Sequence, residues 1–210
     1  MIAILSRFFV LLLVLAPTEL CAQLPRPSAR TPIPRALPSA TPPLKRASEL
    51  IRKQDPINVS VRLLEKVTPQ NSRVRVSLAK QRAYLLLGEE IVIDSPISSG
   101  KRAGMTTSGS FHVLEKDKAH HSSVYGDFKD AAGRIVRSGV SMRIDSAPSG
   151  THFVGAEMKW FMRLTDEGVG MHVGILPGYP ASHGCIRMPS AAAEMFYSHV
   201  QSGTPVEVGE

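Results

Sequence analysis

The sequence predicts a mainly β fold, a sandwich or barrel that carries one or two short helices. Short apolar segments separated by turns fill most of the chain, a pattern typical of these architectures. A length of 210 residues allows one ordinary domain plus extensions. The 43% of apolar residues is enough to build a hydrophobic core, which excludes global disorder. The absence of any 18-residue apolar run excludes a multi-span membrane protein, and the two cysteines exclude a disulfide-stapled mini-domain.

Alternation and turn residues predict the elements in chain order. A short helix is expected over 48–54, with Ser48 as its cap and Glu49 in its first turn. Strands are expected over 57–64, 73–78, 82–87, 90–97, 110–114, 140–144, 170–175 and 205–208. A second helix is expected over 190–200, because a possible cap at Pro189 and Ser190 is followed by good helix formers.

The net charge of +7 is concentrated near the start of the chain. Residues 23–47 hold five basic and no acidic residues, whereas 48–210 hold nineteen basic and seventeen acidic ones, a balance of +2. A nearly neutral domain without a recognised DNA-binding motif does not favour a nucleic-acid partner. The basic segment favours anionic envelope surfaces in general.

The first 22 residues have the pattern of an export signal. Arg7 precedes an apolar run over 8–16, and small or neutral residues follow near a cleavage position after Ala22. One alternative is an uncleaved membrane anchor, although the apolar run is short for a membrane span. Another is a lipidated Cys21, although residues 18–20 do not fit the pattern that precedes a lipidated cysteine. We therefore expect the protein to be exported to the periplasm or cell envelope.

Residues 23–47 hold seven of the sixteen prolines and are expected to form an extended, basic tether. The tether is either a spacer that keeps a domain away from a membrane or a disordered remnant. Residues 48–72 are expected to form an N-terminal extension of the domain that follows.

Cys185 is the only cysteine left once residues 1–22 are removed. It is a buried small side chain, an intermolecular link or a reactive thiol. Its neighbours favour the thiol, because His183 and Arg187 flank it at two residues and such groups favour a thiolate. The Gly184 and Cys185 N–H groups are plausible oxyanion donors, since glycine permits the backbone angles such a pocket needs.

A nucleophilic cysteine also needs a base, and two histidines are candidates. His172 lies in an apolar segment, thirteen residues before Cys185, and the loop over 177–180 can fold it back against the thiol. A histidine in such a segment is otherwise more often a satisfied core residue. His183 is too close along the chain for easy geometry and is expected to orient the loop.

Together these segments resemble the signature of the L,D-transpeptidase (YkuD-type catalytic domain) family. That signature is a histidine, a variable loop, and Ser/Thr-His-Gly-Cys followed by an apolar residue and Arg or Asn. The matching segments are Gly-Met-His-Val-Gly (170–174) and Ser-His-Gly-Cys-Ile-Arg-Met (182–188). Similar pieces upstream are the hairpins and Ser-Ser-Gly turn over 74–100, Thr-Thr-Ser-Gly-Ser-Phe (106–111) and Ser-Ser-Val-Tyr-Gly (122–126). The similarity covers roughly residues 73–208.

The resemblance implies an acyltransferase that acts on the stem peptides of peptidoglycan. Carried over by position, Cys185 is the nucleophile and His172 the proton donor and acceptor. The thiolate attacks the carbonyl of the third stem residue and releases the terminal D-alanine, and the side-chain amine of a neighbouring third residue takes the acyl group. Neither metal nor cofactor is required.

Further residues are carried over as supporting groups, namely Ser182, His183, Gly184 and Arg187. Arg187 either holds the loop or pairs a substrate carboxylate, since arginine suits both roles. Tyr125 either lines the substrate cleft or fills the core.

Other functions share most of these features. An L,D-carboxypeptidase that trims stem tetrapeptides would use the same residues, as would transfer to a lipoprotein lysine. A non-catalytic wall-binding module is the alternative from another class, although it has no need for an exposed thiol. Papain-like peptidases place cysteine before histidine, the reverse of the order here. Adjacent His120 and His121 do not favour a metal site, because they point in different directions on a strand.

The sequence departs from the family pattern at two points. Thr107 replaces a frequent proline in a turn. The loop between His172 and Ser182 has nine residues, fewer than in many members, which suggests a more open acceptor side.

Overall fold

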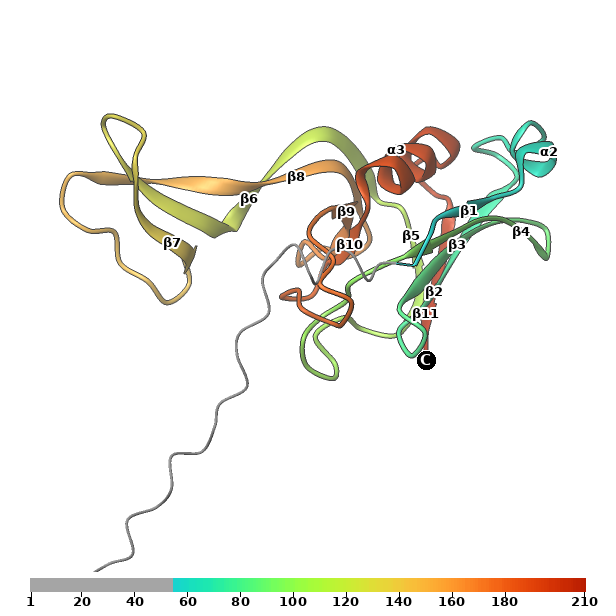
Figure 1. Cartoon of the computed structure of the whole chain (residues 1–210), viewed down its shortest axis with the longest axis horizontal. Helices are drawn as coiled ribbons and strands as arrows, with labels where there is room; N and C mark the ends of the chain where they lie inside the picture. The colour runs from blue at the N-terminus through green and yellow to red at the C-terminus, as the bar shows by residue number, and fades with distance from the viewer. Residues whose placement is uncertain (1–54) are drawn as a thin grey trace, which may run out of the picture. The chain divides into compact units, whose positions relative to one another are not determined.

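The computed structural model describes residues 55–210 (Figure 1). The expected signal over 1–22, the tether over 23–47 and the helix over 48–54 lie outside the described residues. None of the helices within 55–210 is long and apolar enough to cross a membrane.

The first of two sheets has six strands in the order β1-β4-β3-β2-β11-β5. The strands are β1 (Asn58–Val59), β2 (Ser72–Ser77), β3 (Arg82–Leu87), β4 (Glu90–Pro96), β5 (Gly109–His112) and β11 (Pro205–Gly209). Strands β3 and β4 form a hairpin at Gly88, whose φ of 58° suits a glycine. The last strand, β11, lies between β2 and β5 and runs parallel to β2, so the end of the chain completes the middle of the sheet.

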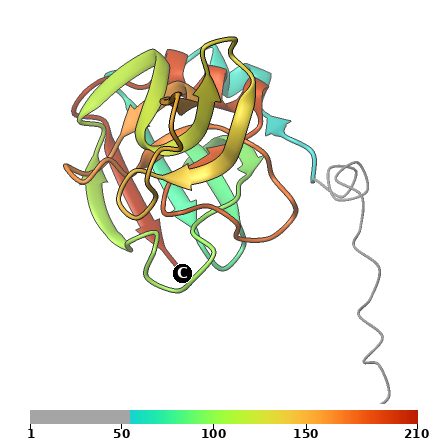
Figure 2. The same cartoon turned by 90° about the vertical axis from the view of Figure 1, so that its left-hand side faces the viewer.

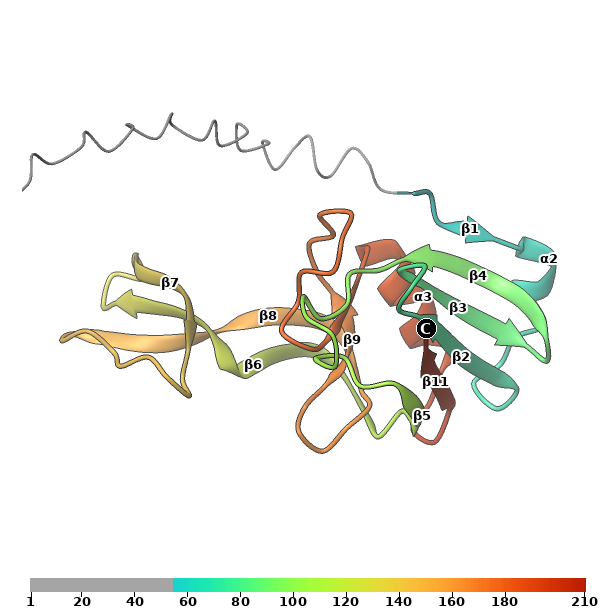
Figure 3. The same ribbon diagram turned by 90° about the horizontal axis from the view of Figure 1, so that it is seen from below.

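The second sheet has five strands in the order β10-β9-β8-β6-β7. The strands are β6 (Glu115–Asp130), β7 (Ile135–Ser141), β8 (Thr151–Arg163), β9 (Gly170–Val173) and β10 (Ile186–Met188). Figures 1 and 3 show β6 and β8 running side by side away from the first sheet, with β7 at their far end. We call β6, β7, β8 and the turns between them the arm, residues 115–163.

Two glycines let the arm strands approach closely where their register shifts. Gly126 lies opposite Gly155. A Cβ at Gly126 would lie 2.1 Å from the Val154 oxygen, and one at Gly155 would lie 2.0 Å from the Ser122 oxygen. Any larger residue at either position would force the two strands apart.

One core joins the two sheets and the longer helix. Helix α3 (Ser190–His199) packs on β8 and β9, and the short helix α2 (Val61–Leu64) packs on β4. The core holds side chains from both sheets and α3, including Val76, Leu85, Met171, Ile186 and Phe196. Figure 2 shows α3 and the strands of the first sheet behind the arm.

The predicted mainly β class with one or two short helices is confirmed, and residues 55–210 contain two helices. The strand predicted over 57–64 is wrong beyond residue 59, because Ser60 begins a turn into α2. The strand predicted over 140–144 lies at 135–141 instead, and β6, β8 and β10 were missed. Much of β6 and β8 is half-buried or exposed on both faces, so their sequences lack the alternation that identifies a strand.

Candidate active site

The candidate catalytic side chains gather where β9 and β10 run in parallel. Arg187 lies opposite His172 in the register of these strands. Side chains alternate between the faces of a strand, and Ile186 and Met188 are buried in the core. His172 and Arg187 therefore point to the opposite face, and Cys185, two residues before Arg187, lies on the same side. The charge of Arg187 acts on both the imidazole and the thiol, as this placement requires.

A Ser-Ser-Gly turn after β4 holds both ends of the loop that carries the thiol. Ser98 and Arg187 exchange two backbone hydrogen bonds of 2.9 and 3.0 Å. The Ser99 oxygen accepts from the N–H groups of Ala181 and Ser182 at 3.0 and 2.9 Å. Both serines are buried, so these bonds are shielded from water. The turn thus serves as the backbone scaffold of the loop.

Two buried hydroxyls fix the loop from the inside. Thr106 Oγ1 accepts from the Gly100 N–H at 2.8 Å and donates to the Gly184 oxygen at 2.6 Å. Ser182 Oγ accepts from the Gly184 N–H at 3.0 Å and donates to the Cys185 oxygen at 2.5 Å. Each hydroxyl uses both its donor and an acceptor site, so the loop has one preferred shape.

Gly184 adopts a φ of +139°, and a Cβ there would lie 3.0 Å from the Met105 oxygen. Of the two N–H groups expected as oxyanion donors, that of Gly184 donates to Ser182 Oγ in this structure. Among residues 55–210, no hydrogen bond from the Cys185 N–H is found.

His172 is buried, with 7% of its surface exposed. Its Nδ1–H donates to the Val173 oxygen at 2.7 Å, which leaves Nε2 as the acceptor. Burial lowers the pKa of His172 to about 4, while the bond to Val173 acts in the opposite direction and the charges of Arg187 and His120 lower it further. The imidazole is therefore neutral near pH 7.

The Cys185 thiol is half-buried and donates weakly to the Gly168 oxygen at 3.6 Å. Burial raises the pKa of this thiol. Three groups oppose the rise: a hydrogen bond from the Gly170 N–H to the sulfur, and the charges of Arg187 and Arg163. The resting site thus holds a neutral thiol and a neutral imidazole, with groups in place that favour the thiolate.

His183 links the loop to the arm. Its ring stacks on Tyr125 of β6 with centroids 4.5 Å apart, and its Nε2 lies 3.0 Å from Lys101 Nζ. Burial, Lys101 and Arg187 all lower the pKa of His183. The ring is exposed, and it connects Tyr125 to the loop that carries Cys185.

An aromatic cluster supports His172 from the side of β8. The fully buried Phe161 ring stacks on His120 at 4.1 Å and is tilted toward His172 at 6.3 Å. A Cβ on Gly170 would lie 2.5 Å from Phe161 Cε2, so the backbone of β9 rests directly on this ring. The cluster fixes the position of the strand that carries His172.

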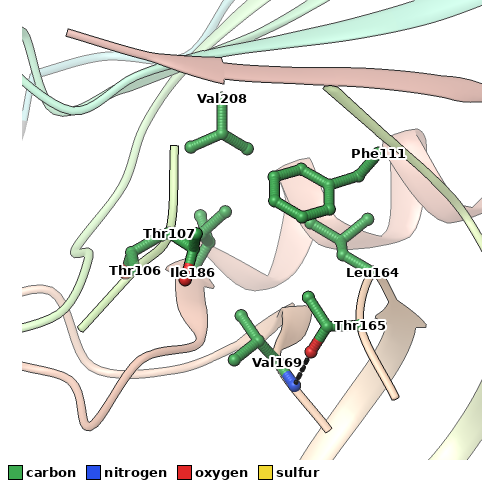
Figure 4. A pocket seen from close by; sticks show the side chains of 8 residues that line it. All are labelled: Thr106, Thr107, Phe111, Leu164, Thr165, Val169, Ile186 and Val208. Carbon is green, nitrogen blue, oxygen red and sulfur yellow. Dashed lines mark hydrogen bonds between the residues drawn. The ribbon is translucent and has the colours of Figure 1, made fainter. Parts of the chain in front are cut away.

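A cavity of about 10 Å³ lies behind the loop (Figure 4). Thr106, Val169 and Ile186 line it together with apolar residues of the core, and the Val169 N–H donates to Thr165 Oγ1 within it. Because Ile186 points to the core face of β10, this cavity lies on the core side of the loop that carries Cys185.

Sequence reasoning missed several residues that build the site. Ser98, Ser99 and Thr106 lie in segments singled out only for their resemblance to the family, and their bonds to the loop were not foreseen. Lys101 and Phe161 carried no signal in the sequence. Within residues 55–210, no group of three histidine, cysteine, aspartate or glutamate side chains could hold a metal ion.

A family model described as the L,D-transpeptidase catalytic domain, YkuD, matches residues 71–208. No curated protein matches the chain. Among solved structures, L,D-transpeptidase 1 of Mycobacterium tuberculosis is 22% identical over 66% of this chain and 62% of its own, with a TM-score of 0.47. An L,D-transpeptidase of Mycobacterium smegmatis is 21% identical over 66% of this chain and 58% of its own, with a TM-score of 0.49. The chain thus spans about three fifths of these structures, and similarities of this size say nothing about what it acts on.

Proposed function

The chain belongs to the L,D-transpeptidase catalytic domain (YkuD) family, and we propose that it cross-links peptidoglycan stem peptides by acyl transfer through Cys185. Family membership assigns it a peptidoglycan L,D-transpeptidase domain. The observation that supports this particular chemistry is the shared face of β9 and β10, where a buried base, a half-buried thiol and an arginine lie together.

In the first step the Cys185 sulfur attacks the carbonyl carbon of the third stem residue. His172 Nε2 takes the thiol proton, because Nδ1–H is held by the Val173 oxygen. The carbon–nitrogen bond to the terminal D-alanine then breaks, and the leaving nitrogen receives that proton from His172. A thioester remains on Cys185.

The neutral resting pair makes His172 a general base that acts as the bond forms. The pKa of the imidazole is held low and that of the thiol high, so a preformed ion pair is disfavoured. As negative charge develops, the Gly170 N–H and Arg187 stabilise it at the sulfur. The Cys185 N–H is available for the carbonyl oxygen.

In the second step the side-chain amine of a neighbouring third residue attacks the thioester. His172 accepts the amine proton and returns it to the sulfur as the carbon–sulfur bond breaks. Water in place of the amine would give L,D-carboxypeptidase activity, and a lysine of a protein would give attachment to that protein.

The proposal includes a location. The export signal over 1–22 would deliver the chain to the periplasm or cell envelope, and the basic tether over 23–47 would favour anionic surfaces there. Sequencing the N-terminus of protein recovered from the envelope tests this, with a start after Ala22 as the expected result. An intact N-terminus would indicate an anchor.

The test of the function is product analysis by mass spectrometry after incubation with tetrapeptide-stem muropeptide. Wild type is compared with Cys185→Ala, and far-ultraviolet circular dichroism verifies that both are folded. A cross-linked dimer with loss of D-alanine, from wild type alone, is the expected result. A tripeptide product without the dimer would show that the chain acts instead as an L,D-carboxypeptidase. Turnover by Cys185→Ala would overturn the mechanism, and no turnover by folded wild type would favour a wall-binding module.

A second consequence is covalent inhibition. From the family resemblance we expect slow acylation of Cys185 by carbapenem-type β-lactams. Intact-mass analysis should show one added inhibitor mass on wild type and none on Cys185→Ala. An unchanged wild-type mass after prolonged incubation would count against an acylating thiol.

A further inference from the structure

Four residues form one row across the second sheet, and the row ends at the thiol. Glu115 of β6 pairs with Arg163 of β8, and Arg163 pairs with Gly170 of β9. Cys185 comes next, because it stands immediately before β10, whose first residue pairs with the residue after Gly170. The backbone of Arg163 is therefore about 10 Å from that of Cys185, two strand spacings of about 5 Å each, which an arginine side chain can span.

Arg163 points to the face of the sheet that carries the candidate site. Its neighbours Met162 and Leu164 both belong to the core, so Arg163 and Phe161 take the opposite face. The Phe161 ring occupies the space over Gly170, where a Cβ would meet it at 2.5 Å. The guanidinium lies over this ring, with its carbon 5.5 Å from the ring centroid. Arg163 thus packs on the aromatic cluster of the site.

The turn that follows Arg163, residues 164–169, holds the thiol. The Gly168 oxygen accepts from the Cys185 thiol at 3.6 Å, and a Cβ on Gly168 would lie 3.5 Å from Arg163 Nη1. The guanidinium therefore lies against the residue whose carbonyl group bonds the thiol. Just after the turn, the Gly170 N–H bonds the same sulfur. Arg163 thus packs directly against the segment that provides both of these contacts.

Glu115 partly neutralises the arginine from the far end of the row. Arg163 Nη2 donates to Glu115 Oε1 at 2.9 Å, which leaves Nη1 next to Gly168. The Glu115 side chain is 53% exposed and that of Arg163 is 24% exposed. Water screens the outer carboxylate more than the inner guanidinium, so the pair keeps a positive side toward the thiol.

The charges that act on the thiol from the surrounding elements are positive. Arg163 of β8 and Arg187 of β10 both favour the thiolate, against the burial that raises the pKa of the thiol. His172 of β9 is neutral near pH 7. Asp166 and Glu167 of the turn are exposed, and within residues 55–210 no carboxylate acts directly on the thiol.

We infer that Arg163 is a positioning residue of the reaction: it holds the turn over 164–169 against Cys185 and places a positive charge, partly neutralised by Glu115, near the sulfur. A nearby cation favours the thiolate as it forms, because opposite charges attract. The role of Arg163 in stem-peptide turnover rests on the proposed function, whereas its effect on the reactivity of the thiol does not.

The first experiment measures how the alkylation rate of Cys185 by iodoacetamide depends on pH between 6 and 11. The full chain is used, and peptide mass mapping separates Cys185 from Cys21. The variants are Arg163→Met, which removes the charge, Arg163→Lys, which keeps it, and Glu115→Gln, which removes the counter-charge. Arg134→Met is the matched control, because Arg134 forms an ion pair of 2.8 Å with Asp130 in the arm.

We expect Arg163→Met to raise the midpoint of this profile by about 0.5–1 pH unit, which lowers the rate at pH 8 about 3- to 10-fold. Glu115→Gln should lower the midpoint, because the cation then lacks its counter-charge. Arg163→Lys should stay closer to wild type than Arg163→Met does, and Arg134→Met should match wild type.

The opposite signs separate a charge effect from a structural one, because a merely structural ion pair would be lost equally in both variants. Shifts of Arg163→Met and Glu115→Gln in the same direction would overturn the inference, as would an unshifted Arg163→Met that is folded by circular dichroism. If Arg163→Met does not fold, a Glu115→Gln midpoint that fails to fall would overturn it.

The second experiment measures turnover of a tetrapeptide stem by wild type and Arg163→Met. The variant should lower kcat about 3- to 10-fold and leave KM near the wild-type value, because Arg163 acts on the sulfur and not on the substrate. A raised KM with an unchanged kcat would assign Arg163 to substrate binding and overturn the positioning role. If wild type turns over no stem peptide, the proposed function fails, and the alkylation profiles still decide the role of Arg163.

Discussion

At the scale of single residues, the site follows from the two-residue period of a strand. Met171, Ile186 and Met188 fill the core, so His172 and Arg187 must face the other side. Burial near the core then sets the chemistry, because it lowers the pKa of His172 and raises that of Cys185. The same packing that places the pair also keeps both members neutral at rest.

The low pKa of His172 predicts a loss of stability in mild acid. The unfolded imidazole has a pKa of 6.5 and the folded one about 4, so between these values the unfolded chain binds more protons. The free energy of unfolding should therefore fall as the pH drops from 6.5 to 4, by about 3 kcal/mol from this group, and then level off. Urea unfolding of wild type and His172→Gln across this range isolates the contribution.

The exposed His183 provides the control for that experiment. His183→Gln should change the pH dependence far less, because its ring is mostly in solvent. If the curves of wild type and His172→Gln run parallel between pH 6.5 and 4, the imidazole is not held neutral by burial.

The raised pKa of Cys185 predicts late ionisation. Its alkylation by iodoacetamide should still accelerate at a pH where the rate for an exposed thiol has levelled off, because burial disfavours the thiolate. Mass spectrometry of samples quenched at successive times, between pH 6 and 11, measures how the alkylation rate depends on pH. A plateau well below pH 9 would mean that the thiolate is stabilised at rest.

At the scale of elements, the loop that carries Cys185 depends on segments about eighty residues earlier. Thr106 and the Ser98–Gly100 turn hold the loop through hydrogen bonds that are buried. The arm reaches the same loop through the stack of Tyr125 on His183. The site is therefore assembled from three separate pieces of chain.

Thr106→Val should weaken the loop. It leaves the Gly100 N–H and the Gly184 oxygen without partners in a buried place, at a cost of about 2–4 kcal/mol of unfolding free energy. Thr106→Ser keeps the hydroxyl and should retain most of the stability and activity. Denaturant unfolding measures the stability of each variant, and turnover of stem peptide measures its activity. If Thr106→Val changes neither, Thr106 does not hold the loop in place.

Gly155→Ala should move the arm. Its Cβ would meet the Ser122 oxygen at 2.0 Å, so β6 and β8 must separate near Tyr125, with a loss of about 1–3 kcal/mol of stability. Stem-peptide turnover should also fall as the contact with His183 is disturbed. Gly209→Ala is the matched control, because nothing lies within 4 Å of its added Cβ. If both variants have the same stability and the same turnover, the close approach of β8 to β6 at Gly155 is not needed for either.

At the scale of the whole molecule, the two ends of the described chain depend on each other. Strand β11 lies between β2 and β5, with Val206 and Val208 in the core. Val206→Asp places an unpaired charge there and should cost at least about 4 kcal/mol, whereas the exposed Glu207→Gln should be nearly neutral. Thermal unfolding compares them, and a stable Val206→Asp would contradict a core that closes through β11.

The sequence was most informative where the chemistry is local. The Ser182–Arg187 segment was sufficient to recognise the family, which the match over residues 71–208 confirms. The alternation of β2 and β11 was equally readable, because each has one mostly buried face. The arm was not, because its polar strands are stabilised by each other and by the facing glycines rather than by one apolar face. The roles of Ser98 and Thr106 were hidden because their partners lie about eighty residues away.

The most direct test of the central claim is the intact mass of the protein during reaction with a tetrapeptide stem. Rapid acid quenching of wild type should reveal a species heavier by the stem lacking its terminal D-alanine, attached at Cys185 by peptide mapping, while Cys185→Ser shows no thioester. A wild-type protein that releases D-alanine but carries no covalent adduct at any quench time would contradict acyl transfer through Cys185.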